Sequence, residues 1–447
     1  MTLVIPGVEV RVVKEVVAPQ LSPSGVLGLV GVTEKDPGGA RSVQSWSRFV
    51  ELFGQASAFS LPEAAQALQN GVSELVVSPV SADAAVAASV AIPAETGTAF
   101  TLHARAGGCW ANGLEVGIAS RSVLDRPVLD ILVTRGADTL EALRGLPADP
   151  DAPPLAELVA ARSALLTATE AAAPPRPGTY TLGGGRDAGR DDYARALGLL
   201  ESEADVDMVL AGVQDFADPK RVAQIYSDVI AHCARMSANS RGRIGFGQVP
   251  PAGAPQQWAE MANQLLSERF VLLAPNGVAG AVAGMVGGLD YFQSPTFKAI
   301  AGVPDLPRRL YVEEQEALLK ASVVPVAAMR GRGTVVVRGL TTDGDQISVR
   351  RVADRAVRGV RLIGDLFIGR LNNETGRGAL REKLVEFLVQ MERDGAIVPS
   401  TDRSDPAFKV NVHSSQDDFV KGIVRVDMAV RPVRAIDYIY ATVLVQT

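Results

Sequence analysis

The residues that could do chemistry are few, and the most suggestive group is a glycine-rich loop. Residues 183–189 read Gly-Gly-Gly-Arg-Asp-Ala-Gly, after a strand-like stretch and before an expected helix. In a phosphate-binding loop, backbone N–H groups and the N-terminus of a helix surround an anion. The spacing here is GxGxxxG, which differs from the dinucleotide pattern GxGxxG, and no GKS or GKT follows. The loop therefore favours a plain turn over a nucleotide site, and we expect no cofactor.

Side chains suited to catalysis or to metal binding are also sparse. The histidines and cysteines are His103, His232, His413, Cys109 and Cys233. They are scattered and no GxSxG motif is present, whereas a hydrolase needs a nucleophile, a base and an orienting group within reach. His232 and Cys233 are adjacent, which is not a catalytic spacing, and three scattered histidines do not indicate a metal site. We therefore predict no catalytic residue and no metal site, with a catalytic α/β protein as the alternative.

The composition of the 447-residue chain is that of an ordinary globular protein. Hydrophobic residues make up 47% and charged residues 21%, which excludes a disordered, collagen-like or coiled-coil chain. The formal net charge is −6, and the tryptophans do not alternate with basic residues, so no nucleic-acid partner is expected. Residues 1–10 do not resemble a signal peptide, and the longest apolar run is too short to span a bilayer. We expect synthesis and assembly in a cytoplasm, without direct membrane insertion.

A mixed α/β fold must position these sparse groups. Apolar strands alternate with helices in residues 21–95 and again in residues 179–332, which predicts parallel strands in a doubly wound domain. Residues 96–178 are rich in short strands and glycine turns, so a β-rich domain is expected to be inserted between these parts. Residues 333–447 predict an α+β C-terminal domain, and residues 1–20 a separate N-terminal β arm.

Local signals predict the individual elements. Ser45 is expected to cap a helix over Trp46–Phe53, and Ser60 with Glu63 forms a capping-box pattern for the next helix. Further predicted helices are Thr139–Arg144, Tyr193–Glu201, Pro219–Met236, Gln256–Ser267, Val278–Leu289, Ala353–Ile368 and Ala379–Asp394. Predicted strands include Val26–Val32, Glu74–Val80, Val206–Val213, Ile244–Val249, Phe270–Leu273, Thr334–Arg338, Gln346–Arg350, Phe408–Val412, Ile423–Val430 and Ile436–Val445.

Both ends of the chain predict strands that have no local partner. Val8, Val10 and Val12 alternate with charged residues, and proline-rich sequence follows them. At the other end, the predicted strand Ile436–Val445 continues almost to the last residue. Because backbone N–H and C=O groups need partners, each strand must join a distant sheet of the same chain or a sheet of another copy.

Two charged features stand out near the C-terminus. The predicted helix Ala379–Asp394 carries one apolar stripe, with Arg381 and Lys383 among the charged residues of its other faces. Arg350 and Arg351 begin an arginine-rich stretch, which is either a solvated helix face or a surface for an acidic partner.

Several segments, in order along essentially the whole chain, resemble contractile phage tail sheath proteins and the sheaths of phage-tail-like injection systems. Ile5–Val10 resembles the sheath motif PGVYV, and Ser45–Gly54 resembles SWxxFxxxFG. Gly108–Leu114 resembles GxWGNxL, and Leu182–Asp187 resembles LxGGxDG. Arg431–Ile439 resembles xPVxPAEFI.

This resemblance implies a structural, non-enzymatic protein whose central domain is subtilisin-like in fold but lacks the protease triad. It also implies a helical homopolymer around an inner tube protein, which contracts and drives the tube through a target cell envelope. Baseplate and terminator or cap proteins would be further partners, in a virion tail or an injection particle. A degenerate subtilisin-like hydrolase or a nucleotide binder is the alternative. The positions implied in strand exchange between subunits are Val8, Val10, Val12, Tyr438, Tyr440 and Val443, and the positions proposed to face the tube are Arg350, Arg351, Arg381 and Lys383.

Overall fold

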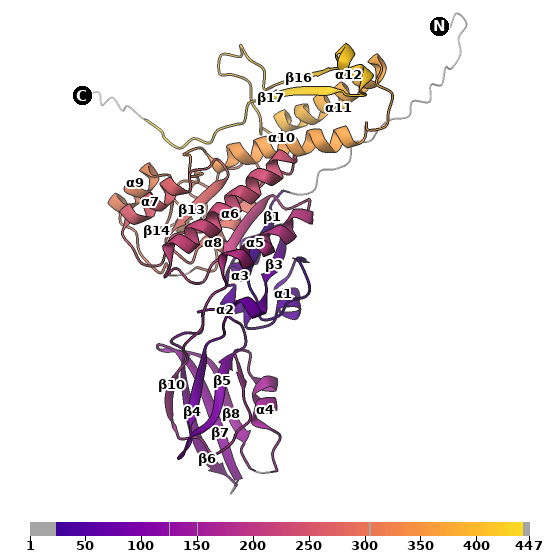
Figure 1. Ribbon diagram of the computed structural model, residues 1–447. Coiled ribbons are helices and arrows are strands. Elements are labelled where there is room, and N and C mark those ends of the chain that lie inside the picture. The colour runs from indigo at the N-terminus through magenta and orange to yellow at the C-terminus, as the bar shows by residue number, and fades with distance from the viewer. Residues whose placement is uncertain (1–23, 125, 150, 304, 441–447) are drawn as a thin grey trace, which may run out of the picture. The chain divides into compact units, whose positions relative to one another are not determined.

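The computed structural model describes residues 24–124, 126–149, 151–303 and 305–440. These residues form two units, one made of residues 24–354 with 434–440 and the other of residues 355–433. Each unit has its own sheet and its own helices (Figure 1). Among the described residues, no helix combines the length and the apolar composition needed to cross a membrane.

A mainly parallel eight-stranded sheet forms the centre of the larger unit. Its strands run, in spatial order, β15 (Gly333–Val336), β14 (Val324–Met329), β13 (Phe270–Ala274), β12 (Ile244–Gln248), β11 (Met208–Gly212), β1 (Val26–Val32), β3 (Glu74–Val80) and β2 (Arg41–Val43). The strands from β14 to β3 are parallel, and β15 and β2 are antiparallel to their neighbours. All seven residues of β1 are buried, as expected for a strand covered on both faces.

Helices cover both faces of this sheet, which confirms the predicted alternation of strands and helices. One core joins the sheet to α5 (Arg190–Leu199), α6 (Pro219–Ala238), α7 (Pro255–Gln264) and α9 (Val312–Lys320). The core on the other face joins it to α1 (Trp46–Phe53), α3 (Glu63–Gln69) and α8 (Ala279–Gly288). The predicted helix boundaries in this region are correct to within a few residues.

The glycine- and alanine-rich helix α8 packs closely on α3. A Cβ atom added at Gly280 would lie 2.5 Å from the backbone of Glu63, and one added at Gly284 would lie 2.5 Å from the carbonyl oxygen of Ala67. These glycines therefore let the two helix backbones approach at a distance that a larger residue would prevent.

One of the two predicted helix caps is correct. The Ser45 hydroxyl accepts a hydrogen bond from the Arg48 amide at the start of α1. The capping box of Ser60 and Glu63 is wrong, because Ser60 ends the short helix α2 (Ser57–Ser60) and donates to the Val32 carbonyl at 2.7 Å. The Ser60 hydroxyl thus satisfies a buried carbonyl at the end of β1 and does not cap a helix.

A β-rich part of the larger unit contains two antiparallel sheets around one core (Figure 1). The first has the order β4 (Ser89–Pro93), β5 (Thr98–Ala104), β9 (Leu166–Ala168), and the second has the order β10 (Gly178–Thr181), β6 (Glu115–Val123), β7 (Arg126–Arg135), β8 (Asp138–Pro147). Helix α4 (Leu155–Arg162) adds Leu155 and Val159 to this core. Short 3-10 turns at Ala82–Ala84 and Leu200–Ser202 complete the larger unit.

The predicted helix Thr139–Arg144 is wrong, because this segment is part of strand β8. Arg135 and Asp138 pair across a two-residue turn, and Gly136 adopts a φ of 58° there. The ladder between β7 and β8 continues as far as Val128 and Pro147. Hairpin pairing with the preceding strand β7 therefore overrides the local helical propensity of the sequence.

The smaller unit packs a long helix against a two-stranded sheet. It contains α11 (Glu374–Arg393), β16 (Phe408–His413), α12 (Gln416–Val420) and β17 (Arg425–Val430), with β16 and β17 antiparallel. The apolar stripe predicted for α11 is confirmed, because Leu380, Leu384, Leu388 and Met391 are buried. Helix α10 (Ile347–Asp365) begins in the larger unit and continues into the smaller one.

The predicted strand Gln346–Arg350 is wrong, because α10 already begins at Ile347. Only Gln346 makes a strand-like contact, an isolated antiparallel bridge with Leu340. The turn at residues 341–345 brings these two residues together, with the Thr341 amide donating to the Asp345 carbonyl at 2.9 Å. Residues with β-branched side chains at 347 and 349 are thus accommodated in the first turn of a long helix.

Candidate interaction surfaces

The C-terminal segment, residues 434–440, is attached to the larger unit by polar side chains. The Gln346 amide pairs with the backbone of Ala435: its oxygen accepts from the Ala435 N–H at 2.9 Å, and its nitrogen donates to the Ala435 carbonyl at 3.1 Å. The Asp437 carboxylate accepts from Arg338 Nε at 2.9 Å and from Gln346 Nε2 at 2.8 Å. Arg434 forms an ion pair with Asp345 at 2.6 Å. These contacts hold the beginning of the segment.

Beyond this attachment the segment exposes large apolar side chains. The exposed fractions are 63% for Tyr438, 84% for Ile439 and 94% for Tyr440. Within the subunit, residues 436–440 pair with no strand, and residues 441–445 of the predicted strand Ile436–Val445 lie outside the described residues. Pairing with a sheet of another copy, one of the two alternatives given for this strand, stays a prediction.

The other positions proposed for strand exchange lie outside the described residues. These are Val8, Val10 and Val12 at the N-terminus and Val443 at the C-terminus. Their role stays a prediction.

Arg350 and Arg351 lie in the first turns of α10 and make contacts within the larger unit. Arg350 forms ion pairs with Glu268 and Asp354, both at 3.1 Å. Arg351 is buried and donates to the Val286 carbonyl at 2.8 Å, at the C-terminal end of α8, where the helix dipole favours a positive charge. Both side chains thus join α10 to neighbouring elements of this unit.

Arg381 and Lys383 lie on α11 in the smaller unit. Arg381 is exposed, and Lys383 pairs with Glu386 at 2.9 Å, one helical turn further on. Of the four proposed tube-facing residues, Arg350 and Arg351 therefore belong to the larger unit, and Arg381 and Lys383 belong to the smaller one. Whether any of the four faces a tube stays a prediction.

The glycine-rich loop uses its own backbone donors within the protein. The amides of Gly183, Gly185 and Arg186 donate to Ser89 O, Asn112 Oδ1 and Val86 O, each at 2.9–3.1 Å. Those of Ala188 and Gly189 donate to Asp187 Oδ1 and Asp192 Oδ2. A phosphate would have to displace these bonds, so the turn interpretation is the one that the geometry favours.

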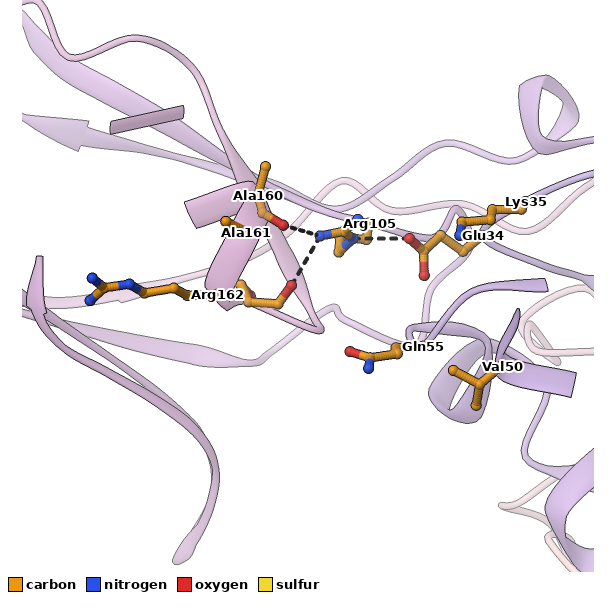
Figure 2. A pocket seen from close by; sticks show the side chains of 9 residues that line it. Glu34, Lys35, Val50, Gln55, Arg105, Ala160, Ala161 and Arg162 are labelled. Atoms are coloured by element: carbon orange, nitrogen blue, oxygen red, sulfur yellow. Dashed lines mark hydrogen bonds and ion pairs between the residues drawn. The ribbon is translucent and has the colours of Figure 1, made fainter. Parts of the chain in front are cut away.

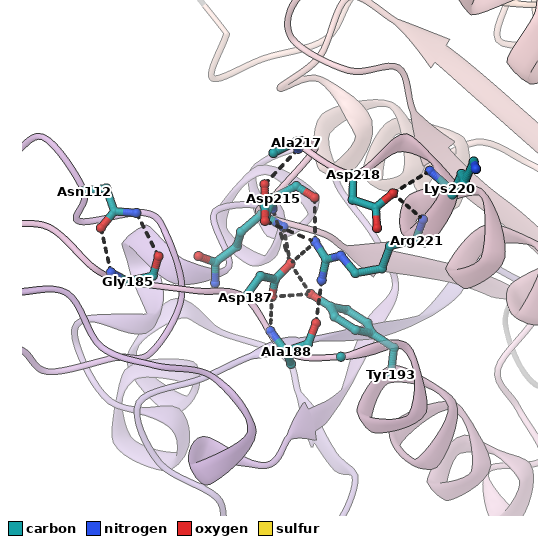
Figure 3. Close-up of polar contacts among 12 residues, drawn as sticks. Asn112, Gly185, Asp187, Ala188, Tyr193, Asp215, Ala217, Asp218, Lys220 and Arg221 are labelled. Atoms are coloured by element: carbon teal, nitrogen blue, oxygen red, sulfur yellow. Dashed lines mark hydrogen bonds and ion pairs between the residues drawn. The ribbon is translucent and has the colours of Figure 1, made fainter.

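Asp187 is the centre of a buried polar network beside this loop (Figure 3). Its carboxylate accepts from the Tyr193 hydroxyl at 3.0 Å and from the backbone amides of Gln214 and Asp215 at 3.1 and 3.3 Å. Arg221 lies 3.4 Å from the same carboxylate. The network ties the loop to the end of β11 and to the start of α6, which is a structural task.

The other titratable groups do not form a catalytic or metal-binding cluster. Burial lowers the pKa of His232 to about 4, and the ring contacts Arg243 at 2.7 Å. Burial raises the pKa of Cys233 to about 12 and that of Cys109 to about 11, so neither thiol is activated. Within the described ranges, no three His, Cys, Asp or Glu residues are placed to hold a metal ion.

A polar cavity of 290 Å³ lies where the β-rich part meets the sheet (Figure 2). Arg105 crosses this junction: its Nε lies 2.9 Å from Glu34 Oε1, and its Nη1 donates to the carbonyls of Ala160 and Ser163, both at 3.0 Å. The Arg105 and Glu34 side chains are therefore engaged with each other and with the backbone of the β-rich part. We assign the junction a structural role.

The polar attachment of the C-terminal segment was not predicted from the sequence. Arg338, Asp345 and Gln346 lie almost one hundred residues before Asp437, and no periodicity connects them. The available signal was the acidic position in the motif xPVxPAEFI, which Asp437 matches in this chain.

Comparison with known proteins identifies the class. Residues 187–342 match the phage tail sheath protein central domain, and residues 341–446 match the phage tail sheath C-terminal domain. Together the two matches cover more than half of the chain. No curated protein sequence matches.

Solved structures of sheath proteins share the fold over nearly the whole chain. The sheath tail protein from Desulfitobacterium hafniense is 16% identical, with 96% of this chain and 97% of that one covered and a TM-score of 0.56. A chain of the anti-feeding prophage baseplate is 14% identical, with 100% of both chains covered and a TM-score of 0.59. A chain of the contracted PVC sheath complex, from an extracellular contractile injection system, is 11% identical, covers 99% and 98%, and has a TM-score of 0.60.

The chain belongs to the phage tail sheath protein family. It is a contractile tail sheath subunit, a structural protein and not an enzyme, as the sequence resemblance implied.

Proposed function

We propose that this protein polymerises helically around an inner tube, and that the assembled sheath contracts and drives the tube through a target cell envelope. Membership of the sheath family supports the proposal, as does the fold shared with a chain of a contracted sheath complex. No nucleotide is required, because the energy for contraction is stored in the extended lattice during assembly. The particle is a phage tail or an extracellular injection particle, with baseplate and terminator or cap proteins as partners.

The observation that carries the proposal is the exposed C-terminal segment. Tyr438, Ile439 and Tyr440 expose most of their surface directly after residues that are firmly attached. Large apolar side chains next to one another at a protein surface mark a binding site for another protein. An extended segment binds by adding a strand to a sheet, with main-chain hydrogen bonds giving the affinity. We infer that the segment, through Tyr438, Tyr440 and Val443, pairs with a sheet of a neighbouring subunit, and that Val8, Val10 and Val12 act in the same way.

The surface that contacts the tube is proposed to include Arg381 and Lys383 of α11. Arg350 and Arg351 support this role less, because their guanidinium groups already pair within the larger unit. We propose that the subunit has five parts, with a subtilisin-like central domain. Their boundaries are residues 1–20, 21–95, 96–178, 179–332 and 333–447.

Electron microscopy of the purified protein and of a variant lacking residues 1–18 tests the proposal. We expect helical sheaths or tubes from the full chain, and a folded subunit that does not polymerise from the variant. Circular dichroism and thermal melting of the variant show whether its fold is intact. A full chain that stays monomeric at high concentration and with its tube protein would contradict the proposed function, and unchanged tube formation by the variant would contradict the role of the N-terminal arm.

A further inference from the structure

The contacts of the C-terminal segment stop abruptly at one residue. Up to Asp437 the segment is held by the Arg434 side chain, the Ala435 backbone and the Asp437 side chain, which is only 7% exposed. The Ile436 side chain between them is 79% exposed, so the attachment uses alternate residues. Tyr438 still lies under the Arg338 guanidinium, 5.3 Å from the ring centroid, with the ring itself 63% exposed. Ile439 and Tyr440 are then almost fully exposed. The change from held to exposed therefore falls between residues 437 and 439.

The side chains of Gln346 and Arg338 also fix which residues of the segment contact the larger unit. Gln346 pairs with Leu340 through its backbone, directly precedes α10, and binds the backbone of Ala435 through its amide. Arg338 follows strand β15 and reaches Asp437. A segment held by both residues cannot slide along the body without breaking several hydrogen bonds together.

Such fixation matters for a segment that pairs as a strand. A slip of one residue in the pairing register would move every side chain of the strand to the opposite face. A segment that is ordered before binding also loses less conformational entropy when it binds. Both effects depend on where the held part ends.

We infer that Asp437 is a positioning residue which, with Arg338 and Gln346, fixes residues 434–437 to the subunit's own body, so that the part of the C-terminal segment available to a second copy begins at Tyr438. This inference rests on the proposed function in one respect, namely that the partner is a second copy of the chain. The attachment itself is a property of the single subunit.

Limited proteolysis of unassembled subunits tests the attachment. Trypsin can cleave after Arg434, inside the held part, whereas chymotrypsin can cleave after Tyr440 in the exposed part. We expect slow tryptic loss of residues 435–447 from the wild type, measured by intact mass, and rapid chymotryptic cleavage. Asp437→Asn should accelerate the tryptic cut by about tenfold, because cleavage follows the population of the released segment, and should leave the chymotryptic rates unchanged.

Matched variants separate this effect from general destabilisation. Asp191→Asn removes an exposed carboxylate of α5 and should leave both rates unchanged. Arg338→Lys keeps the positive charge but loses the Nε donor, and its effect should not add to that of Asp437→Asn, since both variants remove the same contact. Thermal melting of each variant shows that the body remains folded.

Assembly of the same variants, observed by electron microscopy, tests the positioning. We expect Asp437→Asn to form fewer or irregular sheaths, and Asp191→Asn to assemble as the wild type does. Wild-type cleavage after Arg434 as rapid as after Tyr440, or an Asp437→Asn variant that is cleaved and assembles normally, would overturn the inference. If the wild type forms no sheath but shows the expected proteolysis, the proposed function fails while the attachment stands.

Discussion

Two buried side chains in the larger unit, Glu63 and His232, are each held in an uncharged form by their surroundings. Burial raises the pKa of Glu63 from 4.5 to about 7, although a backbone hydrogen bond and a long one of 3.4 Å from Gln248 Nε2 act in the opposite direction. Burial lowers the pKa of His232 from 6.5 to about 4, and the neighbouring Arg243 guanidinium acts in the same direction. The two shifts have opposite consequences for stability.

We expect these two residues to tilt the pH dependence of stability in opposite directions. The contribution of His232 is complete above pH 6.5 and is lost as the pH falls toward 4, while that of Glu63 is complete below pH 4.5 and is lost as the pH rises toward 7. Relative to the wild type, His232→Gln should therefore make the unfolding free energy fall more with rising pH, and Glu63→Gln should make it rise more. Each slope change is at most about 1.4 kcal/mol per pH unit.

Urea unfolding at several pH values between 4.5 and 6.5 measures these slopes. The exposed carboxylate of Glu386, on α11, provides a control, and Glu386→Gln should keep the shape of the wild-type profile. Parallel profiles for wild type, His232→Gln and Glu63→Gln would show that neither residue titrates differently in the folded and unfolded states.

Among the elements, the contact between α3 and α8 depends on glycine. Gly284 has no room for a methyl group, because the added Cβ would lie 2.5 Å from Ala67 O and 2.6 Å from Ala67 Cα. Those atoms belong to the backbone of α3, which cannot move without shifting the helix on the sheet.

Gly284→Ala should therefore destabilise the protein by about 1–3 kcal/mol, although alanine favours a helix by about 1 kcal/mol over glycine. Gly198 of α5 is the matched control, since an added Cβ there meets no atom within 4 Å. Gly198→Ala should be neutral or stabilising by up to about 1 kcal/mol. Chemical unfolding measures both variants, and equal effects at the two positions would argue against close packing as the reason for the glycine.

Sequence patterns predicted those elements in which buried residues form a regular stripe or a continuous run along the chain. The stripe of α11 and the continuous apolar run of β1 are such patterns, and both elements were found correctly. Residues 139–144 were missed because hairpin pairing with the preceding strand β7 decides their structure, and residues 346–350 because the adjoining turn decides theirs. The attachment of Asp437 was missed because Arg338 and Gln346, distant in sequence, are brought to it only by the fold.

At the scale of the whole molecule, the β-rich part is joined to the rest of the larger unit through adjacent backbone positions. Ser89 and Gly183 exchange two hydrogen bonds, at 2.9 and 3.1 Å, and Val86 and Arg186 do the same at 2.9 Å. Residues between these positions form a core of their own, separate from the two cores on the faces of the large sheet. The geometry at residues 89 and 183 is that of two strands ready to be joined by a short turn.

We expect that residues 90–182 can be replaced by Asn-Gly without unfolding the remaining subunit. Asn-Gly favours the two-residue hairpin turn that would connect Ser89 to Gly183. The deletion removes the Arg105–Glu34 ion pair, the stacking of Trp110 on Phe59 and the Asn112–Gly185 hydrogen bonds, among other contacts, and should lower the melting temperature by several degrees. Closing the same deletion with Val-Val, which disfavours the positive φ of that turn, is the control and should give a less stable protein. Non-cooperative melting of the Asn-Gly variant would contradict the prediction.

The adjacent entry and exit positions have a consequence for the gene as well as for the protein. A single recombination event could remove, duplicate or exchange the coding sequence for residues 90–182, while the sheet, the attachment at Asp437 and the C-terminal unit stay in frame. Related genes could then differ in this part and share the eight-stranded sheet that carries it. Related subunits could in this way carry different domains in place of residues 90–182 on the same eight-stranded sheet.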